Sequence, residues 1–533
     1  MSVASGTPNI SPEVAWCPCH GPWACGTAAI KQRERMFAVL AVAAAAQSGT
    51  PVAVPSAQQL AWQDLEVSAM LGWNLQTICA GPSASPSKQH CQADGFVPTV
   101  AQVAAWNPMN IDTDAWARVS ASFGAKYMVI VADHMTGFTW WDTKFHNYSI
   151  AHTQYKGGGA DLVVEMIASC KKYGLKLGFF YSVHFNWFLG VDGFKVGHPP
   201  LGPRSYTQAE YSAIAQGQLR EIIALFGDEG PLEVWFDGGT GLSAGAIGPT
   251  IMDAAPNAVC HSCYSNFTKA GSVRWMGNEN GVMPLPSWGP STSDGSQKIV
   301  ARGQPVGGSF MPPSSDTVLR EHYWFWENNT VQRTKSTLQL VHAYLTSVGR
   351  AANLILNVAP DNTGRVPSSD VSRYAEMGAA IACLWSQPVA SSTSSSSSAP
   401  LAMDVAGLIT WNVESARGTF SGNGCSNCSL VLREDQRQGQ LIGKYAIECR
   451  AVGAAADDFS ACAMGSLANV IEGTALEGVG HKRILLLSVA GGAQLAAIRV
   501  NISTHYAVGA QRPTLRDIAI FDWGGAVESC VRE

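Results

Sequence analysis

The chain has 533 residues, of which 46% are hydrophobic and 14% are charged, and its formal net charge is −5 at pH 7. This length exceeds what one hydrophobic core holds and predicts two or three domains. The small net charge excludes a broad basic surface for nucleic acid and an acidic tail, and it indicates an uncharged partner. The 17 tryptophans serve mainly the core, but they also offer flat apolar faces on which a ring can stack.

Residues 1–58 are predicted to precede the folded part of the chain. Basic residues at 31–35 come before an apolar run at 36–46, which small polar residues follow. This order is typical of a secretory signal, and the run is too short to span a bilayer stably. Because a leader precedes the run, either Met36 lies near the true start or the run is an uncleaved anchor. A disordered alanine-rich leader is the alternative.

Glycosylation sequons also indicate the secretory route. The pattern Asn-X-Ser/Thr begins at Asn147, Asn266, Asn328, Asn427 and Asn501. We therefore expect a secreted, extracellular protein, or one that reaches a vacuolar or lysosomal lumen.

The cysteines give expectations about disulfides and metal. Of the 14, three lie in the leader, which leaves 14 − 3 = 11, so at least one thiol is free or pairs outside the chain. The expected disulfides are Cys79 with Cys91 and Cys425 with Cys428. The run Cys260-His-Ser-Cys263 resembles half a zinc site, but no second half follows at zinc-finger spacing, so we expect no metal.

Strand and helix patterns alternate from residue 59 to residue 388. Buried strands are predicted at 69–75, 126–134, 175–182, 233–236, 258–264, 272–279 and 353–357. Helices are predicted near 112–122, 161–174, 207–226 and 335–349, with a last one ending at 384. The Gly/Pro/Ser-rich segment 281–315 is predicted to be an active-site loop or partly mobile. Such βα units favour a parallel sheet closed into a (β/α)8 TIM-like barrel.

The pattern changes after the barrel. Residues 389–399 are rich in serine and are predicted to be a flexible linker. From 400 to 533 short β-type runs dominate, which predicts a C-terminal antiparallel β-sandwich.

Two carboxylates are predicted at strand ends. Asp237 follows the buried run Val234-Trp-Phe and precedes two glycines, and Glu279 ends the strand at 272–279. In (β/α)8 barrels the polar residues at the carboxyl ends of strands carry the chemistry. Cleavage of a glycosidic bond needs such a pair, one to protonate the leaving oxygen and one to attack or to position water. The alternatives are a turn-forming Asp-Gly and a surface-loop carboxylate at 279.

Several motifs together resemble a known family. They are Trp106-Asn-Pro-Met-Asn-Ile-Asp112, His134 with Gly137-Phe138 and Trp141, Lys156-Gly-Gly-Gly-Ala-Asp-Leu162, Val234-Trp-Phe-Asp-Gly238, Val273-Arg-Trp-Met-Gly-Asn-Glu279, Trp324-Phe-Trp326, and Ser347-Val-Gly-Arg350 with 353–360. Over about 60–385 the chain resembles the α-L-fucosidases of glycoside hydrolase family 29, most of all their plant-type branch. Gly480-His-Lys-Arg-Ile484 resembles part of the family's C-terminal sandwich.

The resemblance implies an exo-acting, retaining α-L-fucosidase that removes terminal α-1,3/1,4-linked fucose from glycans without a metal or cofactor. It implies Asp237 as the nucleophile and Glu279 as the general acid/base. It also implies a sugar pocket at the barrel mouth. The residues that we expect to bind substrate are His134, Trp141, Tyr181, Trp73, Asn74 and Trp326.

The chain departs from the family pattern at two strand ends. It has Gly72-Trp73-Asn74 where the family has a histidine, and Asp133-His134-Met135-Thr136 keeps one histidine of two. Each missing contact to a sugar hydroxyl is worth about 1–3 kcal/mol unless Asn74 or Asp133 replaces it. The rival functions are therefore a hydrolase for a related sugar such as an α-L-galactoside and a weakened carbohydrate-binding homologue. Retention of both carboxylates argues against the latter.

Overall fold

A computed structural model describes residues 52–79, 98–241, 247–261, 263, 271–291, 302–320, 323–327, 334–386, 388–392, 400–413, 428–464, 476–488, 495–523 and 530–531. The predicted signal at 36–46 and most of the serine-rich linker lie outside these ranges. Within the described ranges, no helix combines the length and the apolar character that crossing a bilayer requires.

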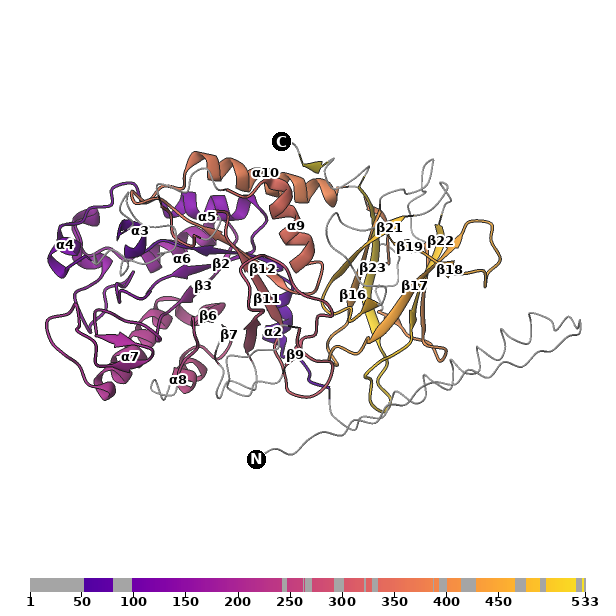
Figure 1. The fold of residues 1–533 in the computed structure, drawn as a ribbon, viewed down its shortest axis with the longest axis horizontal. Coiled ribbons are helices and arrows are strands. Elements are labelled where there is room, and N and C mark those ends of the chain that lie inside the picture. The colour runs from indigo at the N-terminus through magenta and orange to yellow at the C-terminus, as the bar shows by residue number, and fades with distance from the viewer. Residues whose placement is uncertain are drawn as a thin grey trace, which may run out of the picture. The chain divides into compact units, whose positions relative to one another are not determined.

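Parallel strands close into an eight-stranded barrel, which confirms the predicted fold class (Figure 1). In chain order they are β1 (Val67–Leu71), β2 (Tyr127–Val131), β3 (Lys176–Phe180), β6 (Glu233–Trp235), β7 (Val259–His261), β8 (Ser272–Trp275), β11 (Pro313–Thr317) and β12 (Asn353–Val358). The side chains alternate along each strand. Val129 and Val131 belong to the cluster inside the barrel, whereas Met128 and Ile130 pack outside against the helices.

Helices cover the barrel, and most of them contact the next helix around it (Figure 1). They are α5 (Thr113–Ser122), α6 (Leu162–Lys172), α7 (Gln208–Leu225), α8 (Ile247–Ala254), α9 (Thr337–Ser347) and α10 (Ser368–Leu384), with short α3 (Leu75–Cys79) and α4 (Val100–Ala105) near the first strand. Caps set their starts close to the predicted ones. Thr207 and Glu210 form a reciprocal capping box at α7, and Asp112 and Asp161 cap α5 and α6.

Strand β11 was not predicted as a strand. Its sequence, Pro-Ser-Ser-Asp-Thr, begins inside the segment 281–315 that was predicted to be a loop, and all five residues are buried. The rest of that segment contributes β9 (Pro290–Ser291) and β10 (Ser309–Phe310), which pair with each other. Apart from proline, β11 has no apolar side chain, so its sequence shows no hydrophobic pattern that would predict a strand. Its place between β8 and β12 follows from its backbone pairing with these two strands.

Helix α2 (Ala57–Gln63) closes the N-terminal end of the barrel. Gln59 donates to the Ser272 carbonyl at 2.7 Å, and Asn353 donates to the Trp62 carbonyl at 2.8 Å. The Trp62 indole N–H donates to Glu233 Oε2 at 2.8 Å. Ser272, Asn353 and Glu233 are the first residues of β8, β12 and β6, so α2 belongs to the barrel although the predicted leader extended to 58.

Glu233 gives the barrel a pH-dependent stability. Its carboxyl is fully buried, and burial raises its pKa from 4.5 to about 7, while the Trp62 bond lowers it in part. The native state therefore binds this proton more tightly than the unfolded chain does between these two values. The contribution is fully present below about pH 4.5 and is lost as pH rises through about 7.

We expect Glu233→Gln, which keeps an acceptor for Trp62, to remove this dependence. Between pH 4.5 and pH 8 the free energy of unfolding of the wild type should fall by up to about 3 kcal/mol relative to that of the variant. Parallel denaturant or thermal unfolding of both proteins across that range measures it. A constant difference would contradict the assignment.

Two antiparallel sheets form a second domain, which confirms the predicted sandwich. One contains β13 (Pro388–Ser391), β14 (Leu401–Ala402), β16 (Cys428–Glu434), β19 (Ala463–Met464), β21 (Arg483–Ser488) and β23 (Thr514–Asp522). The other contains β15 (Leu408–Asn412), β17 (Lys444–Ala451), β18 (Ser460–Ala461), β20 (Leu476–Glu477) and β22 (Leu495–Ile502). Because β13 pairs with β23, the sandwich begins inside the segment that was predicted to be a linker.

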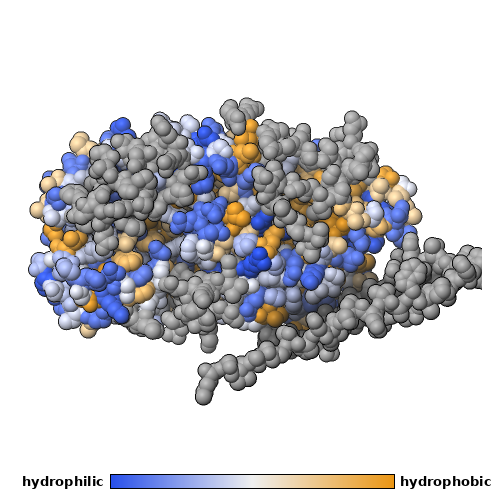
Figure 2. All heavy atoms as spheres, viewed as in Figure 1, coloured by the Kyte–Doolittle hydropathy of each residue, from blue (hydrophilic) through white to orange (hydrophobic). Residues whose placement is uncertain are grey.

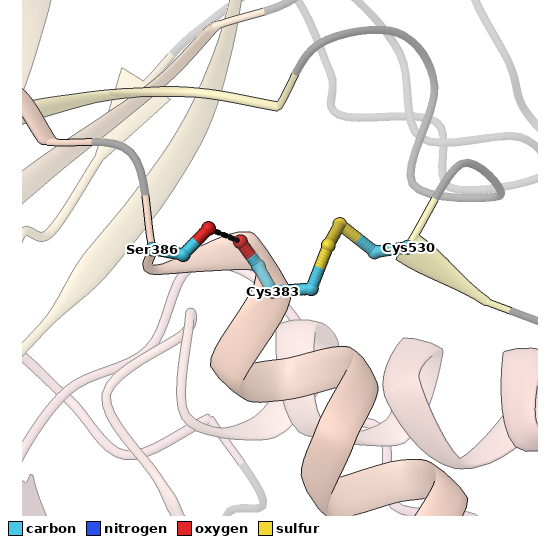
Figure 3. The surroundings of a disulfide bond; sticks show 3 residues. All are labelled: Cys383, Ser386 and Cys530. Carbon is cyan, nitrogen blue, oxygen red and sulfur yellow. Dashed lines mark hydrogen bonds between the residues drawn. A yellow bond between two sulfur atoms is a disulfide. The ribbon is translucent and has the colours of Figure 1, made fainter.

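Polar contacts join the sandwich to the barrel. Lys482 pairs with Glu66 at 2.8 Å, and the side-chain amide of Gln440 bonds the Ser287 carbonyl and the Gly289 amide. A disulfide also joins Cys383 at the end of α10 to Cys530 near the C-terminus (Figure 3). Their sequence separation is 147, and by the chain-entropy model closing such a loop is worth on the order of 5 kcal/mol.

The remaining cysteines are mostly paired. Cys260 and Cys263, the pattern that resembled half a zinc site, form a disulfide, as do Cys449 and Cys462. Cys170 is free and buried, which confirms the expected free thiol. The predicted pairs of Cys79 with Cys91 and of Cys425 with Cys428 involve side chains outside the described residues. The surface shown in Figure 2 intersperses hydrophilic and hydrophobic residues.

Candidate active site

The barrel places both predicted carboxylates at the carboxyl ends of its strands. Asp237 follows β6 by two residues, Glu279 follows β8 by four, and both side chains are exposed. Only β7 lies between β6 and β8. Neighbouring strands are about 4.8 Å apart, so the two strand axes are about 10 Å apart, and side chains that lean toward the barrel axis come closer. The two carboxylates therefore stand at the same end of the barrel, after strands that only β7 separates.

Gly238 allows the turn after Asp237 to lie directly against His184, in the segment that follows β3. Its φ is +73°, and a Cβ there would stand 2.5 Å from Nδ1 of His184. His184 in turn stacks on Phe194, with ring centroids 4.4 Å apart. A larger residue at 238 would push Asp237 away from its position, which is why glycine fits here. His184 is thus a neighbour of the nucleophile candidate.

A third carboxyl lies near these two, on β11, the neighbour of β8 on the side away from β7. Asp316, on β11, is 3% exposed and accepts a hydrogen bond from the Trp275 indole at 2.7 Å. Burial raises the pKa of Asp316 to about 8. The Trp275 bond lowers it, and the charges of Glu279 and Asp237 raise it further. Glu279 and Asp237 therefore both lie close enough to Asp316 for their charges to act on it.

Aromatic rings and a buried histidine form the floor of this region. The rings of Trp235 and His261 stack with centroids 3.5 Å apart and planes 10° apart. Nε2 of His261 lies 2.6 Å from Oγ of Ser314 on β11, and burial lowers the pKa of His261 to about 3, so the ring is neutral. Trp235 lies two residues before Asp237 along the chain, and both rings are almost fully buried.

Two of the predicted substrate-binding residues are half-buried, and one of them, His134, lies among the interior rings of the barrel. His134 is half-buried and lies between Phe180, with which it stacks at 5.4 Å, and the edge of Phe325 at 5.0 Å. Trp326, directly after Phe325, is also half-buried. Because Phe180 and Phe325 belong to the interior cluster, His134 lies on the side of the barrel that the carboxylates share.

Trp73 and Trp141 do not face the mouth, contrary to the sequence-based expectation. Both are buried in the outer cluster between strands and helices. Trp73 packs against Trp106, Trp116 and Trp140, and the indole N–H of Trp141 donates to Glu221 on α7 at 3.2 Å. The structure gives these two rings a packing role in that cluster.

Tyr181 and Asn74 are likewise engaged within the protein. The Tyr181 hydroxyl donates to Gln218 on α7 at 2.7 Å, and the ring belongs to the outer cluster. Asn74 is fully buried, its amide donates to the Val131 carbonyl at 3.2 Å, and its oxygen accepts from the Leu75 amide. This geometry gives no support to a contact of either side chain with substrate.

Asp133 is not placed to contact a sugar, because its side chain is shut off from solvent. It is fully buried, and neither oxygen has a hydrogen-bond partner among the described residues. Burial raises its pKa well above the ordinary value, and the nearby His134 amide offsets this only in part. Its charge also raises the pKa of Tyr181 and Tyr211, which both lie on the helix side of the barrel.

Sequence reasoning missed Asp316, Trp275, His184, Trp235 and His261. Trp235 and Trp275 lie within quoted motifs, and strand alternation from Asp237 back to Trp235 indicates that this ring faces inward. Asp316 gave no such signal because its strand was taken for a loop. His184 lies just past β3, outside every motif quoted from the sequence.

Two alternative kinds of site lack support among the described residues: a metal site and a sugar site on the sandwich. Among the described residues, no three His, Cys, Asp or Glu side chains are arranged to hold a metal ion. A hollow of about 690 Å³ lies on the sandwich, but none of its lining residues is aromatic, and its Arg437 is bound to Asp435. It lacks the ring platform present at the barrel mouth.

The barrel with carboxylates at the ends of β6 and β8 has the architecture of a (β/α)8 glycoside hydrolase. The family model described as alpha-L-fucosidase matches residues 92–383, more than half of the chain. The chain belongs to the α-L-fucosidase family.

Similar proteins come from plants and bacteria. A putative alpha-L-fucosidase 1 of rice is 30% identical over 328 residues, which are 60% of this chain and 57% of that protein. Alpha-L-fucosidase 1 of Arabidopsis thaliana is 25% identical over 333 residues, 60% of this chain and 58% of that protein. The chain thus spans somewhat more than half the length of these relatives. A crystal structure of a putative alpha-L-fucosidase from Bacteroides thetaiotaomicron aligns with a TM-score of 0.70 and 25% identity, and the alignment covers 88% of this chain and 99% of that one.

Proposed function

We propose that this chain is an exo-acting, retaining α-L-fucosidase that removes terminal α-1,3/1,4-linked L-fucose from glycans and glycoproteins. The observation that carries the proposal is the position of Asp237 and Glu279 just past the carboxyl ends of β6 and β8, in a chain of this family. The linkage rests on the resemblance to the plant-type branch. The sugar's apolar face would lie against the aromatic floor.

In the proposed reaction Asp237 attacks the anomeric carbon while Glu279 gives its proton to the glycosidic oxygen. The bond to the leaving group breaks and a glycosyl ester forms at Asp237. Water then attacks the same carbon, Glu279 takes a proton from this water, and the ester bond breaks. Two inversions at one carbon leave the released fucose in the α configuration.

We also propose that the protein passes through the secretory pathway. The signal-like run at 36–46 and the sequons support this. Asn147 is exposed and open to modification, whereas Asn501 lies in β22 with its amide bound to Glu448. The other three sequons begin at residues outside the described ranges.

Hydrolysis assays test the proposed activity and its sugar. Purified protein should release the phenol from an aryl α-L-fucoside and should act more slowly on the matching α-L-galactoside. A panel of α-1,2-, α-1,3-, α-1,4- and α-1,6-fucosylated oligosaccharides then tests the linkage, with release expected from the α-1,3 and α-1,4 members. Faster turnover of the galactoside would replace fucose as the proposed sugar. Binding of fucosylated glycans without turnover would favour the carbohydrate-binding alternative.

A further inference from the structure

Strand β11, which contains Asp316, is hydrogen-bonded to the segment that contains Glu279. The Asp316 carbonyl accepts from the Gly281 amide at 2.9 Å, and Thr317 forms an isolated β-bridge with Asn280. Glu279 lies one residue before this bridge. The segment after β8 is therefore fastened to β11 at the position of Asp316, and any movement of this part of β11 carries Glu279 with it.

The Asp316 side chain fastens the same segment a second time. It accepts from the indole of Trp275, the last residue of β8, at 2.7 Å. Trp275 and Gly281 lie on either side of Glu279 in sequence, and both bond to Asp316, one through the side chain and one through the main chain. Glu279 is thus at the tip of a loop whose two ends meet at one residue.

The charges around Asp316 favour its neutral form. Burial is the main cause of its raised pKa of about 8, and Glu279 and Asp237 are the charged groups that add to it. Other titratable groups on the elements packed around β11 are Arg274 of β8, His342 and Tyr344 of α9, and His261 of β7, which reaches β11 through Ser314. At neutral and mildly acidic pH a proton on Asp316 avoids a third negative charge beside the two reacting carboxylates.

We propose that Asp316 is a positioning residue for the reaction, a neutral third carboxyl that holds Glu279 against the leaving-group oxygen through Trp275 and the Gly281 amide. The inference rests on the proposed function, because it assigns Glu279 the role of general acid. Asp316 itself takes no part in bond making. Its side chain fixes where the acid stands, and displacement of an acid by about 1 Å costs about 100-fold in rate.

Leaving-group dependence tests this role. A phenol of low pKa departs without help from an acid, whereas a phenol of high pKa or a sugar needs the proton. We expect Asp316→Ala to lower kcat/KM for phenyl α-L-fucoside by about 10- to 100-fold. For 2,4-dinitrophenyl α-L-fucoside kcat/KM should change less than about threefold. Turnover of the second substrate also shows that the variant is folded.

Asp316→Asn separates position from charge. Asparagine is neutral and keeps an acceptor for Trp275, so this variant should retain kcat/KM on both substrates within about threefold. Its pH profile should overlay that of the wild type between pH 4 and 7. A shift of its alkaline limb to lower pH by about one unit would show that Asp316 is charged in the working enzyme and would overturn the neutral form.

A double-mutant comparison tests whether Asp316 acts through Glu279. In a Glu279→Ala background the further change Asp316→Ala should have no additional effect on phenyl α-L-fucoside. Asp458→Ala, an exposed carboxyl on the sandwich, is the matched control and should equal the wild type. Equal losses from Asp316→Ala on both substrates, or an undiminished loss in the Glu279→Ala background, would overturn the positioning role. Absence of turnover by the wild type on every fucoside would instead count against the proposed function.

Discussion

Replacement of Asp237 by alanine should abolish hydrolysis of aryl α-L-fucosides, with a loss in kcat of at least about 10³-fold. The reason is that the variant has no group to form the glycosyl ester, while its acid remains in place. Because the Asp237 side chain is exposed at the end of β6, its truncation should leave the barrel folded. Steady-state kinetics on purified wild type and variant, with circular dichroism of both, measures the effect.

Chemical rescue makes this prediction specific to a nucleophile. In Asp237→Gly the space of the carboxylate is free, so added azide should attack the anomeric carbon, expel the phenol with the proton from Glu279, and give a β-configured fucosyl azide. Asp228→Ala, an exposed carboxylate at the other end of β6, is the control and should keep full activity. Full activity of Asp237→Ala would show that another group attacks the sugar.

Replacement of Glu279 by alanine should give a loss that depends on the leaving group. We expect kcat/KM for phenyl α-L-fucoside to fall by about 10²- to 10⁴-fold because this phenol needs a proton to leave. For the dinitrophenyl substrate kcat/KM should change little, while kcat falls because water lacks its base in the second step. The two substrates therefore separate the acid role from the base role.

Azide should restore kcat for the dinitrophenyl substrate in Glu279→Ala, since an anionic nucleophile needs no base. The product should then be an α-configured fucosyl azide, opposite to that of Asp237→Gly. Glu229→Ala, exposed on the turn before β6, serves as the control. A uniform loss on both substrates without azide rescue would assign Glu279 a structural role.

The sequence was sufficient for the barrel because most of its strands are apolar and its helices carry their own caps. Tyr127 to Val131 is apolar throughout, and Thr207 with Glu210 marks the start of α7. Strand β11 was not predicted because its residues, although buried in a closed sheet, are polar and show no hydrophobic pattern. Its place depends on long-range pairing with β8 and β12, which no local pattern encodes.

The site was predictable only in part for a related reason. Asp237 and Glu279 follow strands of their own, so their place at the carboxyl ends followed from local patterns, while their catalytic roles stay predictions. The direction of a side chain just after a strand depends on how the chain leaves the sheet. Tyr181, directly after β3, turns toward α7 for that reason, whereas His134 stays with the interior rings.

The anomeric configuration of the first sugar released tests the double displacement most directly. Proton NMR should be recorded on an aryl α-L-fucoside within the first minutes of hydrolysis by the wild type, before mutarotation. The account predicts that α-L-fucose appears first and that the β anomer grows in later. First appearance of β-L-fucose would mean direct attack by water, and Asp237 would then be a base and not the nucleophile.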